Sequence, residues 1–336
     1  MLSNKIYSID KSNMRQVILD FPKQFRKGLG LAKNVGVSGK FDGVLICGIG
    51  GSALPGEILS TWVNTLKTSF PIYINRDYTV PSHIKKNYLA VCVSYSGNTE
   101  ETLSCFDKIN KDGFKIAGIA SGGKLAELCQ KNKIPFALIP QGYQPRMAIG
   151  FQFAALVKIL SNSGLIKNNL KDILNLEESL KPAELEIKGE TLTASIGGKI
   201  PVIYASNNLK SLAQIWKIKF NENSEIPAFC NYFPELNHNE MMGFSGYNNN
   251  LHMIILRNST DHPRTLKRMA LTAEILKTKG VHADFVEVSG KNILEKIFSN
   301  IILGDWVSYY SAIKRGVDPT PVELNEIFKK RMLGEI

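Results

Sequence analysis

Short apolar runs alternate with amphipathic stretches along the first half of the chain. The runs are rich in β-branched residues and cover 43–50, 71–75, 89–96, 115–121 and 135–140. The segments between them carry apolar residues at helical spacing. This alternation is typical of βαβ units, in which buried parallel strands are connected by helices. The first half therefore predicts a doubly wound parallel sheet.

The second half repeats this alternation. Helices are predicted over 151–164 and 168–188, and strand-like runs follow at 200–206, 251–257 and 283–289. The strand, polar turn and helix of "AVCVSYSGNTEETLSCFDKINKDG" are echoed by "HMIILRNSTDHPRTLKRMALTAEILKTKG". Such an internal echo indicates two similar structural units.

We therefore expect an α/β protein with two tandem lobes, each a doubly wound parallel sheet flanked by helices. The expected limits are 1–155 for the first lobe and 156–316 for the second. A terminal helix is expected within 317–336, after the proline-marked stop "DPTP". A chain of 336 residues is long enough for two such cores.

The hydropathy of the chain indicates its cellular location. The longest apolar stretches have strand length and fall well short of the roughly 20 residues that span a membrane. The first residues, "MLSNKIYSIDKSNMRQ", lack the apolar centre of a signal peptide. We expect a cytoplasmic protein with no membrane partner.

Cysteine, histidine and charge patterns exclude several classes of site. The five cysteines show no CxxC spacing, and the five histidines form no HxH or HExxH pair, so neither disulfides nor a metal site is predicted. The net charge of +11 comes from lysines spread along the chain, without a basic helix. We therefore expect no nucleic-acid partner, and an anionic substrate accounts for the charge equally well.

A serine-rich turn follows the third predicted strand. In "SYSGNTEET" the chain turns at a Gly-Asn pair and then enters a helix, whose free N–H groups and dipole attract anions. The hydroxyls of Ser94, Ser96 and Thr99 could complete a phosphate site there. The alternative is an ordinary helix cap, which uses the same residue types. Three hydroxyls within six residues favour phosphate.

A second glycine-rich turn, "CGIGGSALPGEIL", follows the first predicted strand. Its glycines and Ala53 fit the GxGxxG/A fingerprint of dinucleotide-binding proteins. That motif requires an acidic residue at the end of the second strand, where "PIYINRDY" carries Asn75 and Arg76. Gly51 and Ser52 instead offer a close backbone approach and one more hydroxyl for the same crevice.

These two turns together resemble the sugar isomerase (SIS) domain. The whole chain is similar to the bifunctional phosphoglucose/phosphomannose isomerases, a family with tandem flavodoxin-like lobes. The narrower match rests on "QPRMAIG", "NENSEIPAF", "ELNHNE" and "DPTPVELNEIFKK", which with the two turns span nearly the full length. One departure is Glu225, where the resemblance leads us to expect a basic residue.

The resemblance implies an aldose–ketose isomerase that needs neither metal nor organic cofactor. It would interconvert glucose 6-phosphate or mannose 6-phosphate with fructose 6-phosphate. Glu222 is implied as the base that moves a proton between C1 and C2, and His238 as the acid that opens the sugar ring. Lys329, or its neighbour Lys330, would assist ring opening, and Arg146 would stabilise the enediolate.

The resemblance also implies substrate contacts and an assembly. The implied substrate-binding residues are Gly51, Ser52, Ser94, Ser96, Thr99, Arg146 and Thr320. Thr320 would leave room for either C2 epimer. Because the family supplies the histidine from the neighbouring subunit, we expect a homodimer in which His238 crosses the interface.

Other functions remain open at this point. A pair of SIS lobes can serve as a sugar-phosphate sensor, which would not need the base, the acid and the arginine together. Glucosamine 6-phosphate synthases carry tandem SIS lobes after a glutaminase domain with an N-terminal cysteine, whereas this sequence starts Met1-Leu2. A dinucleotide enzyme is the third alternative.

Overall fold

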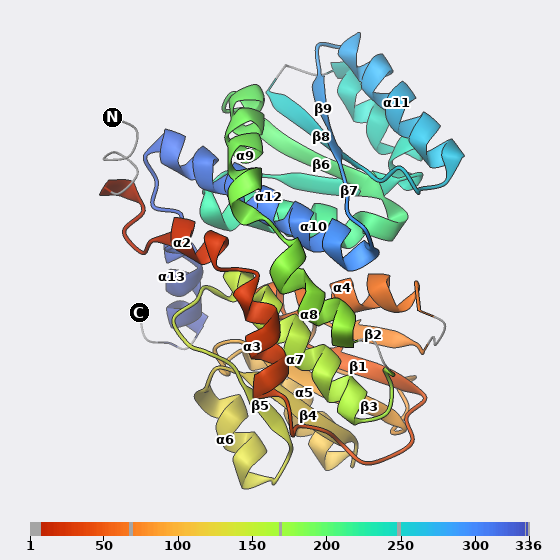
Figure 1. Cartoon of the computed structure of the whole chain (residues 1–336), viewed down its shortest axis with the longest axis vertical. Coiled ribbons are helices and arrows are strands. Elements are labelled where there is room, and N and C mark those ends of the chain that lie inside the picture. The colour runs from red at the N-terminus through yellow and green to blue at the C-terminus, as the bar shows by residue number, and fades with distance from the viewer. Residues whose placement is uncertain (1–7, 67–69, 168–169, 247–249, 333, 335–336) are drawn as a thin grey trace. The chain divides into compact units, whose positions relative to one another are not determined.

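The computed structural model describes residues 8–66, 70–167, 170–246, 250–332 and 334 (Figure 1). The chain divides into two compact units. Unit A comprises residues 20–181 and 290–298, and unit B comprises 1–19, 182–289 and 299–336. The lobe limits expected from the sequence, 1–155, 156–316 and 317–336, stay a prediction.

A five-stranded sheet, sheet A, forms the centre of unit A. Its strands are β1 (Gly43–Cys47), β2 (Ile72–Asn75), β3 (Tyr88–Ser94), β4 (Lys115–Ala120) and β5 (Phe136–Leu138). All neighbours pair in parallel, in the order β2-β1-β3-β4-β5 of flavodoxin-like folds. β1 and β3 are almost entirely buried, as expected for central strands covered on both faces.

Helices cover both faces of sheet A. The helices of unit A are α3 (Lys23–Leu31), α4 (Leu54–Val63), α5 (Glu100–Lys111), α6 (Gly123–Lys131), α7 (Ile149–Asn162) and α8 (Leu170–Ser179), of which α3 and α8 pack on α7. One core cluster joins Leu45 of β1 to Phe106 of α5 and Leu125 of α6. Gly56 of α4 lies against Ile46, whose side chain points to the opposite face from that of Leu45.

A four-stranded parallel sheet, sheet B, lies in unit B. Its strands are β6 (Ile200–Ser206), β7 (Phe229–Phe233), β8 (Leu251–Arg257) and β9 (His282–Glu287), in the order β7-β6-β8-β9. This order repeats the first four positions of sheet A. The segment from β3 to α5 therefore corresponds to the segment from β8 to its following helix, in agreement with the echo in the sequence.

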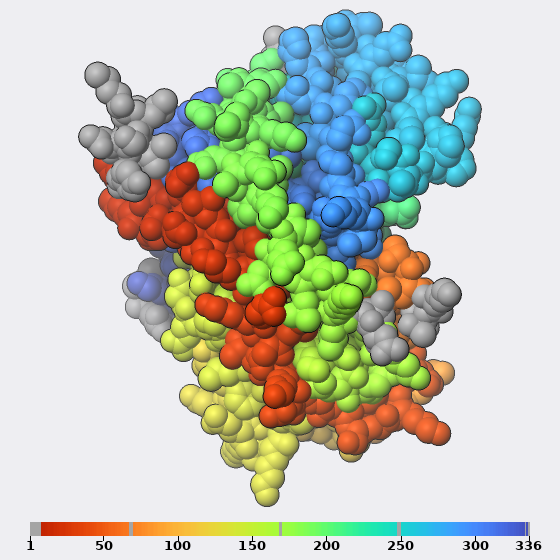
Figure 2. Space-filling view, viewed as in Figure 1, coloured from red at the N-terminus to blue at the C-terminus, as the bar shows by residue number. Residues whose placement is uncertain are grey.

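Unit B contains further helices around sheet B. They are α2 (Met14–Leu19), α9 (Pro182–Ile196), α10 (Lys210–Asn223), α11 (Pro263–Lys277) and α13 (Glu323–Met332), with α12 (Ile293–Arg315) from residue 299 onward. α10 packs against β6 and β7, and α11 packs against β7, β8 and β9. Figure 2 shows α9 (green) and α11 (blue) at the surface.

The predicted fold class, two tandem parallel sheets flanked by helices, is confirmed. The strand β7 was missed by the sequence patterns. It is an edge strand, and within it only Phe233 is buried, whereas Phe229 is exposed. An edge strand that is only partly covered need not carry the continuous apolar run by which buried parallel strands are recognised.

The single helix expected over 168–188 is wrong, and residues 168–169 lie outside the described residues. The chain forms α8 and α9 there, separated by Leu180 and Lys181. α9 begins at Pro182 because proline lacks an N–H and is disfavoured inside a helix but suits the first turn. Within the described ranges, no helix is long and apolar enough to cross a membrane.

Candidate active site

The turn after β1 brings a glycine and a hydroxyl close to a distant segment of unit A. The turn is a short 3₁₀ segment, Gly50–Ser52, that leads into α4. A Cβ on Gly51 would lie 2.8 Å from the carbonyl carbon of Pro145 and 2.9 Å from the backbone nitrogen of Arg146. Glycine is therefore required for this approach, which places Gly51 and Ser52 beside Arg146.

The turn after β3 is built around the hydroxyl of Ser94. This buried oxygen accepts hydrogen bonds from the backbone N–H groups of Gly97 (3.1 Å) and Thr99 (3.4 Å) and lies 2.8 Å from Thr99 Oγ1. Gly97 has φ +75°, and a Cβ there would lie 1.9 Å from the carbonyl oxygen of Gly122. Ser94 and Thr99, both predicted to bind the substrate, thus meet in one turn. The conformation of this turn requires glycine at position 97.

The N-terminus of α5 opens at this turn. Thr99 is the N-cap residue, but its side chain makes no capping hydrogen bond to the helix. Ser96 is exposed on the same turn, and its hydroxyl accepts a hydrogen bond from the N–H of Asn98 at 3.2 Å. First-turn N–H groups without a side-chain cap, together with the helix dipole, form an anion-binding arrangement.

Tyr95 joins the two turns. Its backbone N–H donates to Ser52 Oγ at 3.0 Å. Its phenol donates to the carbonyl oxygen of Pro140 at 2.9 Å and accepts from the N–H of Tyr143 at 2.8 Å. Burial raises the pKa of Tyr95, so the phenol stays protonated and keeps its donor role. The turns after β1 and β3 are therefore held together from two sides.

Arg146 adds a fixed positive charge to this group. It lies in the 3₁₀ turn Pro145–Met147 and is fully buried. Its Nη1 is 3.4 Å from Gln144 Oε1. Because the guanidinium is always protonated, the group combines a permanent cation with an uncapped helix N-terminus, and both favour an anion.

Glu222 lies in unit B, in the last turn of α10, where it is half-buried. α10 ends at Asn223, and two residues later Glu225 is exposed with φ +52°. This left-handed conformation is common just after a helix and usually belongs to glycine or asparagine. Glu225, where the resemblance led us to expect a basic residue, thus shapes the end of the helix that carries Glu222.

His238 is exposed, but the residues around it are anchored. Asn237 Nδ2 donates to Thr272 Oγ1 of α11 at 2.8 Å, and the phenol of Tyr204 donates to the carboxylate of Glu240. Burial raises the pKa of Tyr204, which keeps this donor protonated. Among the described residues, no hydrogen bond or ion pair is found for the His238 imidazole. A fixed segment thus presents an accessible imidazole.

The C-terminal candidates lie near and within α13. Lys329 is exposed and pairs with Glu326 on the same helix, with 2.8 Å between Nζ and Oε1. Lys330 is also exposed, so the choice between the two lysines stays a prediction. The backbone N–H of Thr320 donates to Asp318 Oδ1 at 3.1 Å, which fixes the turn before α13.

The predicted site residues divide between the two units. Unit A brings together Gly51, Ser52, Ser94, Thr99 and Arg146, with Ser96 on the same turn. Unit B carries Glu222, His238, Lys329 and Thr320. In the part of the chain that the structure describes, no group of three or more His, Cys, Asp or Glu side chains could hold a metal ion.

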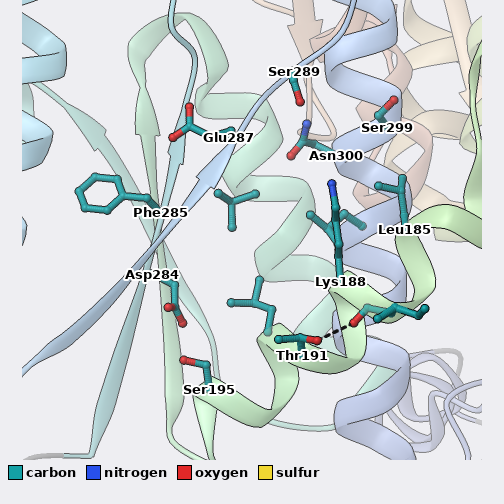
Figure 3. Close-up of a pocket in the computed structure, with 14 residues that line it drawn as sticks. Leu185, Lys188, Thr191, Ser195, Asp284, Phe285, Glu287, Ser289, Ser299 and Asn300 are labelled. Atoms are coloured by element: carbon teal, nitrogen blue, oxygen red, sulfur yellow. Dashed lines mark hydrogen bonds between the residues drawn. The ribbon is translucent and has the colours of Figure 1, made fainter.

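A cavity of about 480 Å³ lies in unit B between α9, β9 and α12 (Figure 3). None of the predicted site residues lines it. Its two carboxylates already have basic partners on β8: Asp284 Oδ2 is 2.7 Å from His252 Nε2, and Glu287 pairs with Arg257. In Figure 3, Lys188 points to the end of the cavity where Asn300 lies.

Two charged residues near Glu222 were not singled out from the sequence. Lys219 of α10 and Asp305 of α12 are fully buried, with 2.6 Å between Nζ and Oδ1. A signal existed, because Lys219 occupies the apolar stripe of its helix, with Trp216 and Phe220. Asp305 likewise interrupts the apolar run "IILGDWVSYY".

Comparison with known proteins extends over the whole chain. Residues 186–332 match the bacterial phospho-glucose isomerase C-terminal SIS domain. The bifunctional phosphoglucose/phosphomannose isomerase of Caldicellulosiruptor bescii is 36% identical over 335 residues, covering 95% of this chain and 98% of the relative. The protein of that name from Aquifex aeolicus is 36% identical over 295 residues, covering 87% and 91%.

Among solved structures, glucosamine-6-phosphate deaminase from Thermotoga maritima is similar with a TM-score of 0.65 and 15% identity, covering 95% of this chain and 96% of that one. This likeness shows the fold alone. The 36% identity to the relative from Caldicellulosiruptor bescii, by contrast, runs almost from end to end of this chain, which itself carries both glycine-rich turns. Together with those turns and the tandem parallel sheets, it means that the chain belongs to the family of bifunctional phosphoglucose/phosphomannose isomerases.

Proposed function

We propose that this protein interconverts glucose 6-phosphate and mannose 6-phosphate with fructose 6-phosphate. The observation that carries the proposal is the hydrogen bond from Tyr95 N–H to Ser52 Oγ, because it joins two glycine-dependent turns beside Arg146. The hydroxyls and the uncapped helix N-terminus form a suitable site for a phosphate group, and the cation of Arg146 lies beside this site. The cytoplasmic location expected from the sequence stays a prediction.

The first chemical step opens the sugar ring. His238 protonates the ring oxygen, and the free amine of Lys329 takes the proton from the C1 hydroxyl of the aldose or the C2 hydroxyl of the ketose. This breaks the hemiacetal or hemiketal and frees the carbonyl. An imidazole suits the acid role because its ordinary pKa is close to neutral. The exposed position of His238 on an anchored segment supports its access to a substrate.

The second step moves the carbonyl between C1 and C2. Glu222 takes the proton from C2 of the open aldose, which leaves an enediolate. The hydroxyl proton passes from O2 to O1, and Glu222 returns its proton to C1, which gives the ketose. The guanidinium of Arg146 stabilises the negative charge of the enediolate, as fixed charges do in other enzymes. Thr320 leaves space at C2, so that the glucose and mannose epimers both fit.

A coupled assay of the purified protein with each aldose phosphate tests the proposal. Both substrates are expected to yield fructose 6-phosphate, and a chelator is expected to leave the rates unchanged. The matched control is the Glu222→Gln protein. The rival function, a sugar-phosphate sensor, requires tight fructose 6-phosphate binding without turnover of either aldose phosphate, and that result would contradict the proposal.

The phosphate site can be tested by removing its accessible hydroxyls. Ser96→Ala with Thr99→Ala is expected to raise KM about tenfold or more, because each charge-assisted hydrogen bond contributes roughly 1.5–3 kcal/mol. Steady-state kinetics measure the effect. Ser104→Ala is the control, since its hydroxyl lies on the same helix but donates to the carbonyl oxygen of Tyr78. An unchanged KM in the double variant would mean that these hydroxyls do not bind the phosphate and only cap the helix.

We also propose a homodimer in which His238 of the partner subunit completes each active site. Two exposed apolar side chains near this segment support a subunit contact: Met242 is 75% exposed and Phe229 of the edge strand β7 is 55% exposed. Exposed apolar groups beside a functional residue are common at subunit interfaces.

The shared site predicts complementation between two inactive proteins. Glu222→Gln and His238→Ala chains, mixed, dissociated and reassociated, should give about half heterodimers by the symmetry of a two-fold assembly. Each heterodimer has one intact site of two, so about a quarter of wild-type activity should return. Mass measurement confirms the heterodimers. Heterodimers without activity would mean that both residues serve the site of one chain.

A further inference from the structure

α10 and α12 are joined by a line of buried polar contacts within unit B. In order along both helices, the contacts are Trp216 Nε1 to the Asn300 carbonyl oxygen (2.8 Å), Lys219 Nζ to Asp305 Oδ1 (2.6 Å) and Asn223 Nδ2 to Ser308 Oγ (2.9 Å). Just beyond the helix, Ser224 Oγ donates to the carbonyl oxygen of Ser308 at 2.8 Å. We call these contacts the polar seam.

The seam is buried. Lys219, Asp305, Asn223 and Ser308 are all 0% exposed. A buried ion pair of this kind is weak evidence for stability, because apolar residues of similar volume often serve as well or better. Its best-attested benefit is specificity, since a polar group in an apolar contact accepts only the arrangement that pairs it.

The spacing of the seam permits one register between the helices. The seam positions on α10 are 216, 219 and 223, and those on α12 are 300, 305 and 308. A slip of α10 by one helical turn, about 5.4 Å, would separate every pair. Each donor and the carboxylate of Asp305 would then be buried without its partner, at high cost.

Glu222 has seam residues on both sides of it in the chain. Lys219 is one turn before it, and Asn223 and Ser224 follow it directly. The last turn of α10 carries the Glu222 carboxylate. The seam therefore fixes where this turn lies relative to α12. Proton transfer depends steeply on such placement, and a displacement of 1 Å can lower the rate about a hundredfold.

We infer that the Lys219–Asp305 pair sets the register of α10 and so positions Glu222 for proton transfer. The inference rests on the proposed role of Glu222 as the catalytic base. Lys219 and Asp305 are positioning residues, because they act through the helix and do not touch the substrate themselves. Their effect should appear in kcat rather than in KM or in folding.

The double variant Lys219→Met with Asp305→Leu tests this inference in the full-length protein. It replaces the ion pair by apolar side chains of similar length, so the melting temperature should equal or exceed that of the wild type. We expect kcat to fall about tenfold or more, KM to change less than about twofold, and the acid limb of the kcat–pH profile to move. Wild-type kcat and an unmoved pH profile would overturn the inference.

Two further variants make the result specific. Thr193→Val is the matched control, because it removes another buried hydrogen bond to α12, from Thr193 Oγ1 to the carbonyl oxygen of Val307 (2.9 Å), and should keep wild-type kcat. If the double variant does not fold, Ser308→Ala tests the inference instead. Within the seam it removes only the hydrogen bond from Asn223 Nδ2 to Ser308 Oγ. A several-fold lower kcat at unchanged KM supports the inference, and wild-type kcat overturns it.

Glu222→Gln, measured in parallel, separates this inference from the proposed function. A fully active Glu222→Gln protein would refute the role of Glu222 and with it the basis of the inference. An inactive Glu222→Gln protein beside a double variant with wild-type kcat would refute only the role of the seam.

Discussion

Glu222→Gln is expected to lower kcat by about a hundredfold or more for both aldose phosphates, while substrate binding persists. The amide keeps the shape of the side chain but cannot accept the proton from C2, and general-base catalysis contributes on the order of 10²–10⁴ in rate. Steady-state kinetics give kcat, and calorimetric titration with fructose 6-phosphate gives the affinity. A loss confined to kcat identifies an interaction made in the transition state.

Glu225→Gln is the matched control for this experiment. It removes a carboxylate three residues away, on an exposed residue beyond the end of α10. Its kcat should stay within about twofold of the wild type, because surface substitutions of this kind have small effects. Near-wild-type turnover in Glu222→Gln would remove Glu222 from the mechanism.

Lys219→Met alone is expected to destabilise the protein by about 3–5 kcal/mol, the usual cost of removing one member of a buried ion pair. The single substitution leaves the carboxylate of Asp305 fully buried without the ammonium group 2.6 Å away. Urea denaturation followed by circular dichroism measures the change in the free energy of unfolding. Adding Asp305→Leu should restore at least the wild-type stability, because the buried carboxylate is then gone as well.

Lys217→Met on the same helix is the comparison for this prediction. Lys217 is partly exposed, so its ammonium is hydrated and its loss should change the free energy of unfolding by less than about 1 kcal/mol. Equal changes in the free energy of unfolding for the two methionine substitutions would show that burial of the Lys219–Asp305 pair does not increase the cost of losing the lysine.

The sequence by itself determined the fold class and the phosphate-binding candidates. Parallel strands covered on both faces must be apolar along their length, so β1, β3, β6 and β8 are visible as runs. Gly51 and Gly97 are equally visible in the sequence. Each must be glycine, because a Cβ at either residue would collide with neighbouring backbone atoms. The helix break at Pro182 also has a local cause, although the pattern of apolar residues alone concealed it.

Only the tertiary structure decided which distant residues meet. β7 is a strand because it pairs with β6, whereas its short sequence FCNYF is interrupted by Asn231 and is only partly buried. The hydrogen bond between Ser52 and Tyr95 joins the turns that follow β1 and β3. The contact between Gly51 and Arg146 joins residues that are far apart in the sequence of unit A. Lys219 stands in the apolar stripe of α10, but only the packing of α12 shows that Asp305 is its partner. Local patterns report how a segment is covered, whereas hydrogen bonds and ion pairs between segments depend on how the helices and strands pack, which no single segment encodes.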